Sequence, residues 1–265
     1  MDLGLAGKTA LITGGSKGIG FACAEALAAE GCHVHIAART AADLALAQEK
    51  LRARYSVDVT PHEADVSSTA AIHKLAEGCG AVDILVNNAG AVPRRSLLDI
   101  DDAEWRAAWD LKIYGSINLT REIYRAMRER GSGVIINIVG ITGEAPNANS
   151  IAGTAGNAAL MAFSRALGSE STNFGVRVVA VNPGLVMTDR TRGLLEGSSS
   201  ADSAAWGSLI DQLPFKRMAE PREIGDVVAF LASGRASYIS GTVVTVDGGS
   251  TNQRWAPSAP RAIPP

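Results

Sequence analysis

A glycine-rich loop between a short apolar strand and a helix-forming segment is the feature that most restricts how this chain can fold. The strand is TALIT at 9–13, the loop is TGGSKGIG at 13–20, and the segment FACAEALAAE follows. Glycines let a backbone turn sharply and approach a phosphate, and the first turn of a helix offers unpaired N–H groups and a positive dipole. In the order strand, loop, helix, this pattern predicts a βαβ unit that holds a phosphate-bearing ligand.

Strand-like and helix-like segments alternate along the rest of the chain. Such alternation predicts an α/β protein with a parallel sheet, and short runs of Val and Ile without polar alternation predict strands covered on both faces. We therefore expect one doubly wound, Rossmann-type domain over 1–250. Strands are expected at 9–13, 33–37, 57–65, 83–87, 134–139, 176–181 and 242–246, and helices at 18–30, 41–54, 68–78, 102–130, 152–173 and 221–233.

Two segments lack these patterns. Residues 197–208, GSSSADSAAWGS, are small and polar and follow the carboxyl end of an expected strand. We expect them to form either an irregular linker or part of a lid-like segment over 190–213. The tail at 251–265 is too rich in proline for a helix or an inner strand, so disorder or packing between subunits is expected there.

Length and composition exclude several classes of protein. A chain of 265 residues with 46% hydrophobic and 20% charged residues suits one large α/β domain. No apolar run approaches the roughly 18 residues of a membrane span, and the first strand leaves no room for a signal peptide. The net charge of −2 argues against a nucleic-acid surface. We therefore expect a cytoplasmic protein with a small-molecule substrate.

The cysteines and histidines show no spacing typical of a metal site. The histidines lie on or near the second and third expected strands, away from the crevice at the carboxyl ends of the strands where ligands bind. No metal is therefore expected. The residues concerned are Cys23, Cys32, Cys79, His33, His35, His62 and His73.

The glycine spacing and several later motifs resemble the short-chain dehydrogenase/reductase family. The loop has the pattern Gly-x-x-x-Gly-x-Gly, and the resemblance extends from there to VVTVDGG, which ends at Gly249. It implies a nicotinamide cofactor, a small carbonyl or hydroxyl substrate, and a homotetramer or homodimer. The matching stretches are ADV (64–66), NNAG (87–90), NPGLVMT (182–188), FLAS (230–233), RMAEPREIGDVV (217–228) and SGTVVTVDGG (240–249), the longer two being similar to the bacterial reductase-like branch.

The resemblance implies where the cofactor binds. The glycine loop would hold its phosphates, the 65–66 segment would flank the adenine, the 88–90 segment would follow the adenosine ribose, and the 183–188 segment would face the nicotinamide carboxamide. A role in stabilising the fold alone is the alternative for these residues. The implied set is Gly14, Ser16, Lys17, Gly18, Ile19, Gly20, Arg39, Asp65, Val66, Asn88, Ala89, Gly90, Pro183, Gly184, Val186 and Thr188.

Charges near the second strand favour a cofactor with a 2′-phosphate. A cofactor without this phosphate is usually held by an acidic side chain on its ribose hydroxyls. This chain instead has Ala38 and Arg39 at that place, with Lys17 in the glycine loop. Because an arginine can bind a phosphate with two parallel hydrogen bonds, NADP(H) is the expected cofactor. An arginine exposed by chance is the alternative.

The side chains that handle the proton in this family are absent from their usual places. The family has an asparagine on its long central helix, a serine after the fifth strand, and a tyrosine followed four residues later by a lysine. At the matching positions this chain has Lys112, Gly140, Gly153 and Asn157. A glycine supplies neither a proton donor nor a charge, so the usual mechanism is not expected here.

Other residues are candidates for acid–base chemistry. Lys112 and Asn157 look like an exchanged pair, although Lys112 could instead extend into solvent. The loop ITGEAPNANS (141–150) adds Thr142 and Glu144, and a partly desolvated glutamate can act as an acid or a base. Three functions remain open: an oxidoreductase with rearranged residues, a non-redox lyase, hydratase or hydrolase on the same fold, and a non-catalytic nucleotide-binding protein.

Overall fold

Seven parallel strands form one sheet in a computed structural model that describes residues 2–196 and 200–255. Their order is β3-β2-β1-β4-β5-β6-β7, which confirms the expected doubly wound α/β fold. The third strand is shorter than expected, and the sixth is longer. The strands are β1 (Thr9–Thr13), β2 (His33–Ala38), β3 (Val59–Glu63), β4 (Ile84–Asn87), β5 (Gly133–Ile138), β6 (Val176–Pro183) and β7 (Thr242–Val246).

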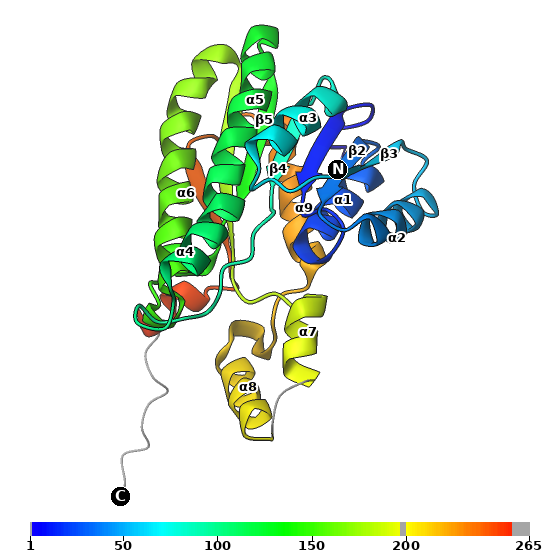
Figure 1. The fold of residues 1–265 in the computed structure, drawn as a ribbon. Coiled ribbons are helices and arrows are strands. Elements are labelled where there is room, and N and C mark those ends of the chain that lie inside the picture. Colours follow the sequence, from blue (N-terminus) through cyan, green and yellow to red (C-terminus); the bar gives the residue numbers. More distant parts are fainter. Residues whose placement is uncertain (1, 197–199, 256–265) are drawn as a thin grey trace, which may run out of the picture.

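Helices cover both faces of the sheet (Figure 1). One layer contains α1, α2 and α9, and the other contains α3, α5 and α6. The α7–α8 segment lies below the sheet in the figure, at the ends of the strands. The helices are α1 (Gly18–Ala29), α2 (Ala41–Arg52), α3 (Thr69–Cys79), α4 (Asp102–Trp109), α5 (Gly115–Arg130), α6 (Ile151–Glu170), α7 (Asp189–Glu196), α8 (Ser200–Gln212) and α9 (Pro221–Ala232).

Successive residues of the inner strands explain this layering. In β1, Ile12 packs toward α1, α2 and α9, whereas the adjacent Leu11 packs toward α3 and α5. Both side chains are fully buried. Because neighbouring residues of a strand point to opposite faces, an inner strand covered on both sides must be apolar throughout. This is the pattern that the sequence shows.

The long helix expected at 102–130 is interrupted. A π-helical turn, Asp110–Tyr114, separates α4 from α5. A π-helical turn adds about one residue to the turn of an α-helix, a change too small for hydrophobic periodicity to reveal, and such turns are frequent at functional sites. Gly115 follows directly, and a Cβ there would lie 2.6 Å from the backbone oxygen of Val66. The turn therefore ends where the helix passes very close to the β3–α3 connection.

The expectation of an irregular linker over 197–208 is wrong for most of that segment. Residues 200–208 belong to α8, and 189–196 form α7. The alanines of SADSAAW favour a helix more than its serines oppose one. In the tail, residues 250–255 form a 3₁₀ turn, while 197–199 and 256–265 lie outside the described residues.

The order of the strands brings two loops together. After β1 the chain continues to β2 on one side of it, whereas after β4 it continues to β5 on the opposite side. The loops that leave β1 and β4 therefore diverge, and a crevice opens at the carboxyl ends of these two strands.

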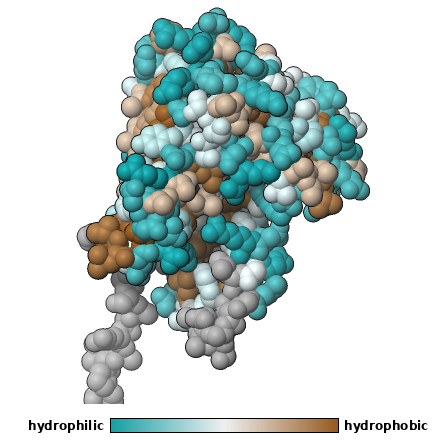
Figure 2. Space-filling view, viewed as in Figure 1, coloured by the Kyte–Doolittle hydropathy of each residue, from teal (hydrophilic) through white to brown (hydrophobic). Residues whose placement is uncertain are grey.

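Figure 2 shows a largely hydrophilic face, with hydrophobic side chains gathered lower down, where the α7–α8 segment meets the main body. Within the described part of the chain, none of the helices combines the length and apolarity that crossing a membrane requires.

Candidate active site

The glycine loop forms a cradle that needs glycine at two of its positions. Gly14 has a φ of +63°, and a Cβ on Gly20 would lie 2.1 Å from the oxygen of Gly14. The helix α1 begins at Gly18, and no side chain among the described residues caps it at Lys17. The first N–H groups of α1 therefore face the loop without a side-chain acceptor. This arrangement fits the diphosphate of a dinucleotide.

Asn88 fastens the loop after β4 to the glycine loop. Its Nδ2 donates hydrogen bonds to the backbone oxygens of Thr13 (3.0 Å) and Gly14 (3.3 Å). The backbone N–H groups of Asn88 and Ala89 both donate to the Thr13 hydroxyl at 3.0 Å. Asn88 therefore shapes the phosphate cradle from behind, while Ala89 and Gly90 line the adjoining cavity.

A cavity of about 220 Å³ lies beside the glycine loop, on the side where an adenosine would bind. Lys17, which lies in that loop, forms an ion pair of 2.8 Å with Asp43. The sequence predicts two cations and no carboxylate here. The structure adds a carboxylate, that of Asp43, which lies in the first turn of α2. The residues lining the cavity are Gly14, Ser16, Ala37, Ala38, Arg39, Thr40, Asp43, Ala64, Val66, Ala89, Gly90, Ala91 and Leu111.

Asp65 lies between two residues that line this cavity, but its carboxylate is already engaged. Burial opposes its ionisation, yet hydrogen bonds from the backbone N–H and the hydroxyl of Ser67 (3.0 and 2.8 Å) outweigh that effect. With a smaller contribution from Arg39, they hold the pKa of Asp65 below its ordinary value. Asp65 is therefore ionised and shapes the β3–α3 turn that bounds the cavity.

The segment after β6 approaches the glycine loop from the other side. A Cβ on Gly18 would lie 3.3 Å from the Cγ2 of Thr188, and a Cβ on Gly184 would lie only 2.9 Å from the Cβ of Asp247. The Val186 strand segment pairs with Ala219, and Pro183 ends β6. Of the expected nicotinamide-side residues, Thr188 therefore stands next to the phosphate cradle. Ile19, in the first turn of α1, is partly buried beneath it.

Lys112 lies in the π-helical turn and points inward. Its Nζ donates a hydrogen bond of 3.1 Å to the backbone oxygen of Val139, directly before Gly140. Its aliphatic stem lies against Gly90, where a Cβ would be 2.9 Å from the Lys112 Cδ. Removal of water from the ammonium lowers the pKa of Lys112 to about 8. The side chain does not extend into solvent, which was the alternative at the sequence level.

Asn157 on α6 is buried and is also oriented. Its Nδ2 donates to the Thr142 hydroxyl at 2.9 Å, whereas its Oδ1 has no hydrogen-bond partner among the described residues. A Cβ on Gly140 would lie 2.8 Å from this Nδ2. The amide therefore fills the space that any larger residue at 140 would need. An unpaired buried acceptor also suits a ligand that donates a hydrogen bond.

Lys112, Gly153 and Asn157 meet at a cavity of about 290 Å³. Two further cations, Arg94 and Arg190, line it, and no Asp or Glu is among the described residues that do so. The guanidinium of Arg94 lies 6.0 Å from the centre of the Trp206 ring, which α8 contributes. The complete lining is Val92, Arg94, Lys112, Ser150, Gly153, Asn157, Leu185, Arg190, Thr191 and Trp206.

Comparison with known proteins agrees with this geometry. Residues 14–251 match the family model described as Enoyl-(Acyl carrier protein) reductase. The chain belongs to the short-chain dehydrogenase/reductase family. Membership in this family agrees with a cavity beside the glycine loop and a second cavity around Lys112.

Several relatives match this short-chain dehydrogenase/reductase over nearly their full length. Galactitol 2-dehydrogenase (L-tagatose-forming) from Cereibacter sphaeroides is 35% identical, over 93% of this chain and 96% of the relative. The 3-oxoacyl-[acyl-carrier-protein] reductase FabG of Escherichia coli is 36% identical, over 92% and 97%. The structure of L-sorbose reductase from Gluconobacter frateurii, complexed with NADPH and L-sorbose, has a TM-score of 0.89 and 35% identity, and the match covers 95% of this chain and 99% of that one.

Glu144 lies apart from the Lys112 cavity of this short-chain dehydrogenase/reductase. Its Oε2 accepts hydrogen bonds from the Asn182 Nδ2 (2.8 Å) and the Thr245 hydroxyl (2.7 Å), and it is not among the described residues lining the cavity. The carboxylate ties the loop after β5 to the ends of β6 and β7. The structure thus brings Lys112 and Asn157 to one cavity, with Thr142 hydrogen-bonded to Asn157, and leaves Glu144 outside this group.

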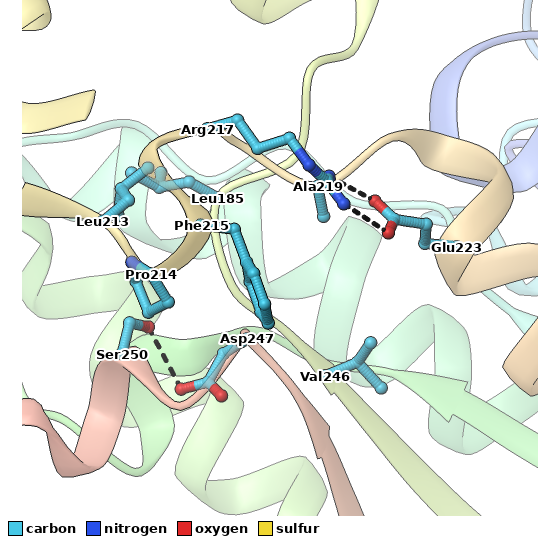
Figure 3. Close-up of a pocket in the computed structure, with 11 residues that line it drawn as sticks. Leu185, Leu213, Pro214, Phe215, Arg217, Ala219, Glu223, Val246, Asp247 and Ser250 are labelled. Carbon is cyan, nitrogen blue, oxygen red and sulfur yellow. Dashed lines mark hydrogen bonds and ion pairs between the residues drawn. The ribbon is translucent and has the colours of Figure 1, made fainter. Parts of the chain in front are cut away.

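A neighbouring cavity of about 280 Å³ lies between the 213–219 segment and the turn after β7 (Figure 3). Two hydrogen bonds from Arg217 to Glu223, of 2.7 and 2.8 Å, close one side. These bonds lower the pKa of Glu223 to about 2. Neither Lys112 nor Asn157 is among its described lining residues, although Leu185 borders both cavities. It therefore adjoins the candidate site but holds none of its acid–base groups.

The structure also assembles a group that the sequence analysis missed. His35, His62 and Cys79 place one possible metal-binding atom each within 4.8 Å of one another. They lie 27 and 17 residues apart along the chain, so no local spacing could reveal them. Pairing of β2 with β3, and packing of α3 on that part of the sheet, bring them together.

Proposed function

We propose that this chain is an NADP(H)-dependent oxidoreductase that acts on a small carbonyl or hydroxyl compound carrying a negative charge, with Lys112 as its proton donor. The observation that carries the proposal is the position of Lys112. Its ammonium is held by Val139 in the cavity that adjoins the cofactor crevice. The names of the relatives, which are dehydrogenases and reductases of hydroxyl and carbonyl compounds, support the reaction class.

The residues present fit NADP(H). The glycine cradle and the first turn of α1 would hold its diphosphate, and Arg39 would hold the 2′-phosphate. Thr188, beside Gly18, would meet the carboxamide. When bound, this cofactor supplies or accepts the hydride. Solved relatives that bind NADPH, such as the L-sorbose reductase, support the assignment.

In this proposal the acid–base group of the family is rearranged. Lys112, Gly140, Gly153 and Asn157 occupy the places of the asparagine, serine, tyrosine and lysine. The ammonium of Lys112 donates the proton that the carbonyl oxygen takes up during reduction, and its neutral amine accepts that proton in the reverse direction. A pKa of about 8 keeps both forms accessible near neutral pH. A lysine can therefore do what the missing tyrosine would do.

Asn157 orients the substrate in this scheme, and Thr142 positions Asn157. The Asn157 amide is fixed by its hydrogen bond to Thr142. Its Oδ1 is buried and has no partner among the described residues, so a substrate hydroxyl would reach it only after a small shift of this side chain. Glu144, which holds Asn182 and Thr245, is a positioning residue that fixes the loop carrying Thr142. The roles differ, since Asn157 lines the cavity, Thr142 acts through its hydrogen bond to Asn157, and Glu144 contacts neither.

The charge of the cavity supports an anionic substrate. Lys112, Arg94 and Arg190 line it without a carboxylate among the described lining residues. Such a site attracts an anion and penalises a cation. Guanidinium groups bind carboxylates and phosphates with paired hydrogen bonds. Glycine at 153 leaves room for the substrate where the family has a tyrosine.

The α7–α8 segment and the outer face of α6 support two further proposals. Arg190, Thr191 and Trp206 come from 190–213 and line the cavity, so this segment serves as a lid. The exposed alanines of α6 suit close packing against a second subunit, so we also propose a homotetramer or homodimer. Neither feature is needed for the acid–base scheme above.

The test is a panel of small ketones that carry a carboxylate or a phosphate, each beside its neutral ester or dephosphorylated analogue. NADPH oxidation, followed by absorbance, should give values of kcat/KM at least about tenfold higher for the charged compounds. Lys112→Gln should lower kcat by roughly 10²–10⁴ because a positioned acid is lost. Arg94→Gln should raise KM for the charged compounds only, and Arg235→Gln, outside the cavity, should change neither.

Two results would overturn the proposal. One is the absence of NADPH oxidation with every charged compound, and the other is unchanged kcat in Lys112→Gln. Consumption of a substrate without NADPH oxidation would favour a lyase, hydratase or hydrolase on this fold.

A further inference from the structure

We propose that His35, His62 and Cys79 form a zinc site at the edge of the sheet, outside the candidate active site. His35 lies on β2, His62 on the edge strand β3, and Cys79 ends α3. Two imidazoles and one thiolate are a ligand set that Zn²⁺ prefers. Three protein ligands leave a fourth position for water.

The distances between the ligand atoms suit a tetrahedral ion. With Zn–N of about 2.0 Å and Zn–S of about 2.3 Å, a tetrahedral site separates N and S by about 3.5 Å and two N atoms by about 3.3 Å. The Cys79 Sγ lies 3.6 Å from the His62 Nε2, and the His35 Nδ1 lies 2.8 Å from the same atom. The two nitrogens face each other in the hydrogen bond between the rings, whose centroids are 5.1 Å apart. To bind one ion, the nitrogens must separate by about half an ångström and both rings must turn so that their lone pairs converge on it.

The two histidines need only a change of tautomer to present both nitrogens to a metal. Burial lowers the pKa of both side chains, and the neighbouring histidines lower that of His35 further, so both rings are neutral at pH 7. Their nearly parallel rings, with an interplanar angle of 16°, share one N–H between Nδ1 of His35 and Nε2 of His62. When zinc binds, that proton moves to the other nitrogen of its own ring, so neither histidine loses a proton to solvent.

Cys79 supplies the proton that binding releases. Burial raises the pKa of its thiol to about 12, so the thiol is protonated without metal. Zinc binding converts it to a thiolate and releases one proton to water, which balances the charge of the step. The other two buried cysteines are not candidates. Cys32, for example, donates its S–H to the backbone oxygen of Leu5 at 3.4 Å.

A path for the ion exists. His62 lines a surface cavity of about 660 Å³, together with Glu63, Lys74, Glu77 and other residues of β3 and α3. An ion can therefore reach the group from solvent on the side of His62. Since the three ligands come from three elements, the ion would join the edge of the sheet to the last residue of α3.

Cobalt is the probe that tests this site. The full-length, cofactor-free protein is treated with a chelator, dialysed and titrated with Co²⁺ without oxygen. We expect visible d–d bands and a thiolate-to-cobalt band in the near ultraviolet, both saturating at one equivalent and both lost when Zn²⁺ is added. Zinc at about 100 times its dissociation constant should raise the Tm by about 5–10 °C.

Variants separate this site from adventitious binding. Cys79→Ser should lose the thiolate-to-cobalt band, and His62→Gln should weaken Co²⁺ binding by roughly tenfold or more. Cys32→Ser is the matched control and should keep both signals. If Cys79→Ser does not fold, His62→Gln still tests the proposal, because His62 lies on the half-exposed edge strand and its replacement should be tolerated. A wild-type protein without the thiolate band, or a band that persists in Cys79→Ser or is undiminished in His62→Gln, would overturn the proposal.

Discussion

Gly90 lies so close to Lys112 that a single methyl group would disturb the lysine. A Cβ at Gly90 would approach the Cδ and Cγ of Lys112 to 2.9 and 3.0 Å, which is closer than van der Waals contact allows. Gly90 also lines the cavity beside the glycine loop. Gly90 therefore forms part of the wall of the cavity beside the glycine loop. It also contacts the aliphatic part of Lys112, whose side chain reaches the second cavity.

The first prediction concerns this contact. Gly90→Ala should push the Lys112 stem aside, move its Nζ from the Val139 oxygen, and lower kcat for reduction by roughly tenfold or more. Steady-state kinetics measures this effect. Gly234→Ala is the control, because a Cβ there meets no atom within 4 Å. Equal kcat in Gly90→Ala and wild type would show that the position of Lys112 does not matter.

The second prediction is a pH dependence. Burial lowers the pKa of Lys112 to about 8, and reduction needs its protonated form. The rate of reduction should therefore be constant below about pH 8 and fall about tenfold per pH unit above it, while oxidation of the alcohol should rise through the same pH range. Profiles of kcat/KM between pH 6 and 10 measure this. Lys112→Gln should abolish the break near pH 8, and a break that survives this change would assign it to another group.

The third prediction concerns choice of cofactor. Arg39→Asp should reverse the preference from NADP(H) to NAD(H), because a carboxylate repels the 2′-phosphate and accepts the ribose hydroxyls. Asp43→Asn should tighten NADPH binding several-fold, because it releases Lys17 from its ion pair. Calorimetric titration with both cofactors measures these changes. Arg222→Asp reverses an exposed charge outside the crevice and should leave the preference as it is; the same shift in that variant would argue against a local effect.

The fourth prediction is that neutral ketones are poor substrates until the family's acid–base group is rebuilt. Gly140→Ser alone should be destabilising, because its Cβ would meet the Asn157 Nδ2 at 2.8 Å. Combined with Lys112→Asn, Gly153→Tyr and Asn157→Lys, it should raise NADPH-dependent reduction of a small reactive ketone. At 153 the new side chain meets mainly the Ser150 hydroxyl, at 2.9 Å, which can rotate away. Rapid reduction of neutral ketones by the unmodified protein would contradict this.

The fifth prediction is a homo-oligomer. Ala158, Ala159, Ala162 and Ala166 are exposed on α6, where spacings of three and four place them on one face. Ala162→Glu should give a monomer by light scattering at micromolar concentration, whereas Ala45→Glu on the exposed face of α2 should not. A monomeric wild-type protein would rule the assembly out.

The order and type of the main elements could be read from local patterns. TALIT followed by TGGSKGIG predicts a strand, a phosphate cradle and a helix, since each of these depends on neighbouring residues. The runs at β4 and β6 are apolar throughout because both faces of these strands are covered. The same reasoning missed two elements. The serines of α8 suggested an irregular segment, but its alanines favour a helix. The π-helical turn around Lys112 differs from an α-helix by only about one residue per turn, which hydrophobic periodicity does not reveal.

The chemistry of the site depended on contacts between distant residues. The sequence by itself determined that glycines stand at 140 and 153 and that a lysine stands at 112. Only the tertiary structure decided that Lys112 turns inward and is desolvated, that Asp43 pairs with Lys17, and that Glu144 is engaged elsewhere. It likewise brought His35, His62 and Cys79 together. Burial, pKa and ligand geometry are set by atoms that meet only when the sheet and its helices pack, because the distance between two side chains is not a property of either one's local sequence.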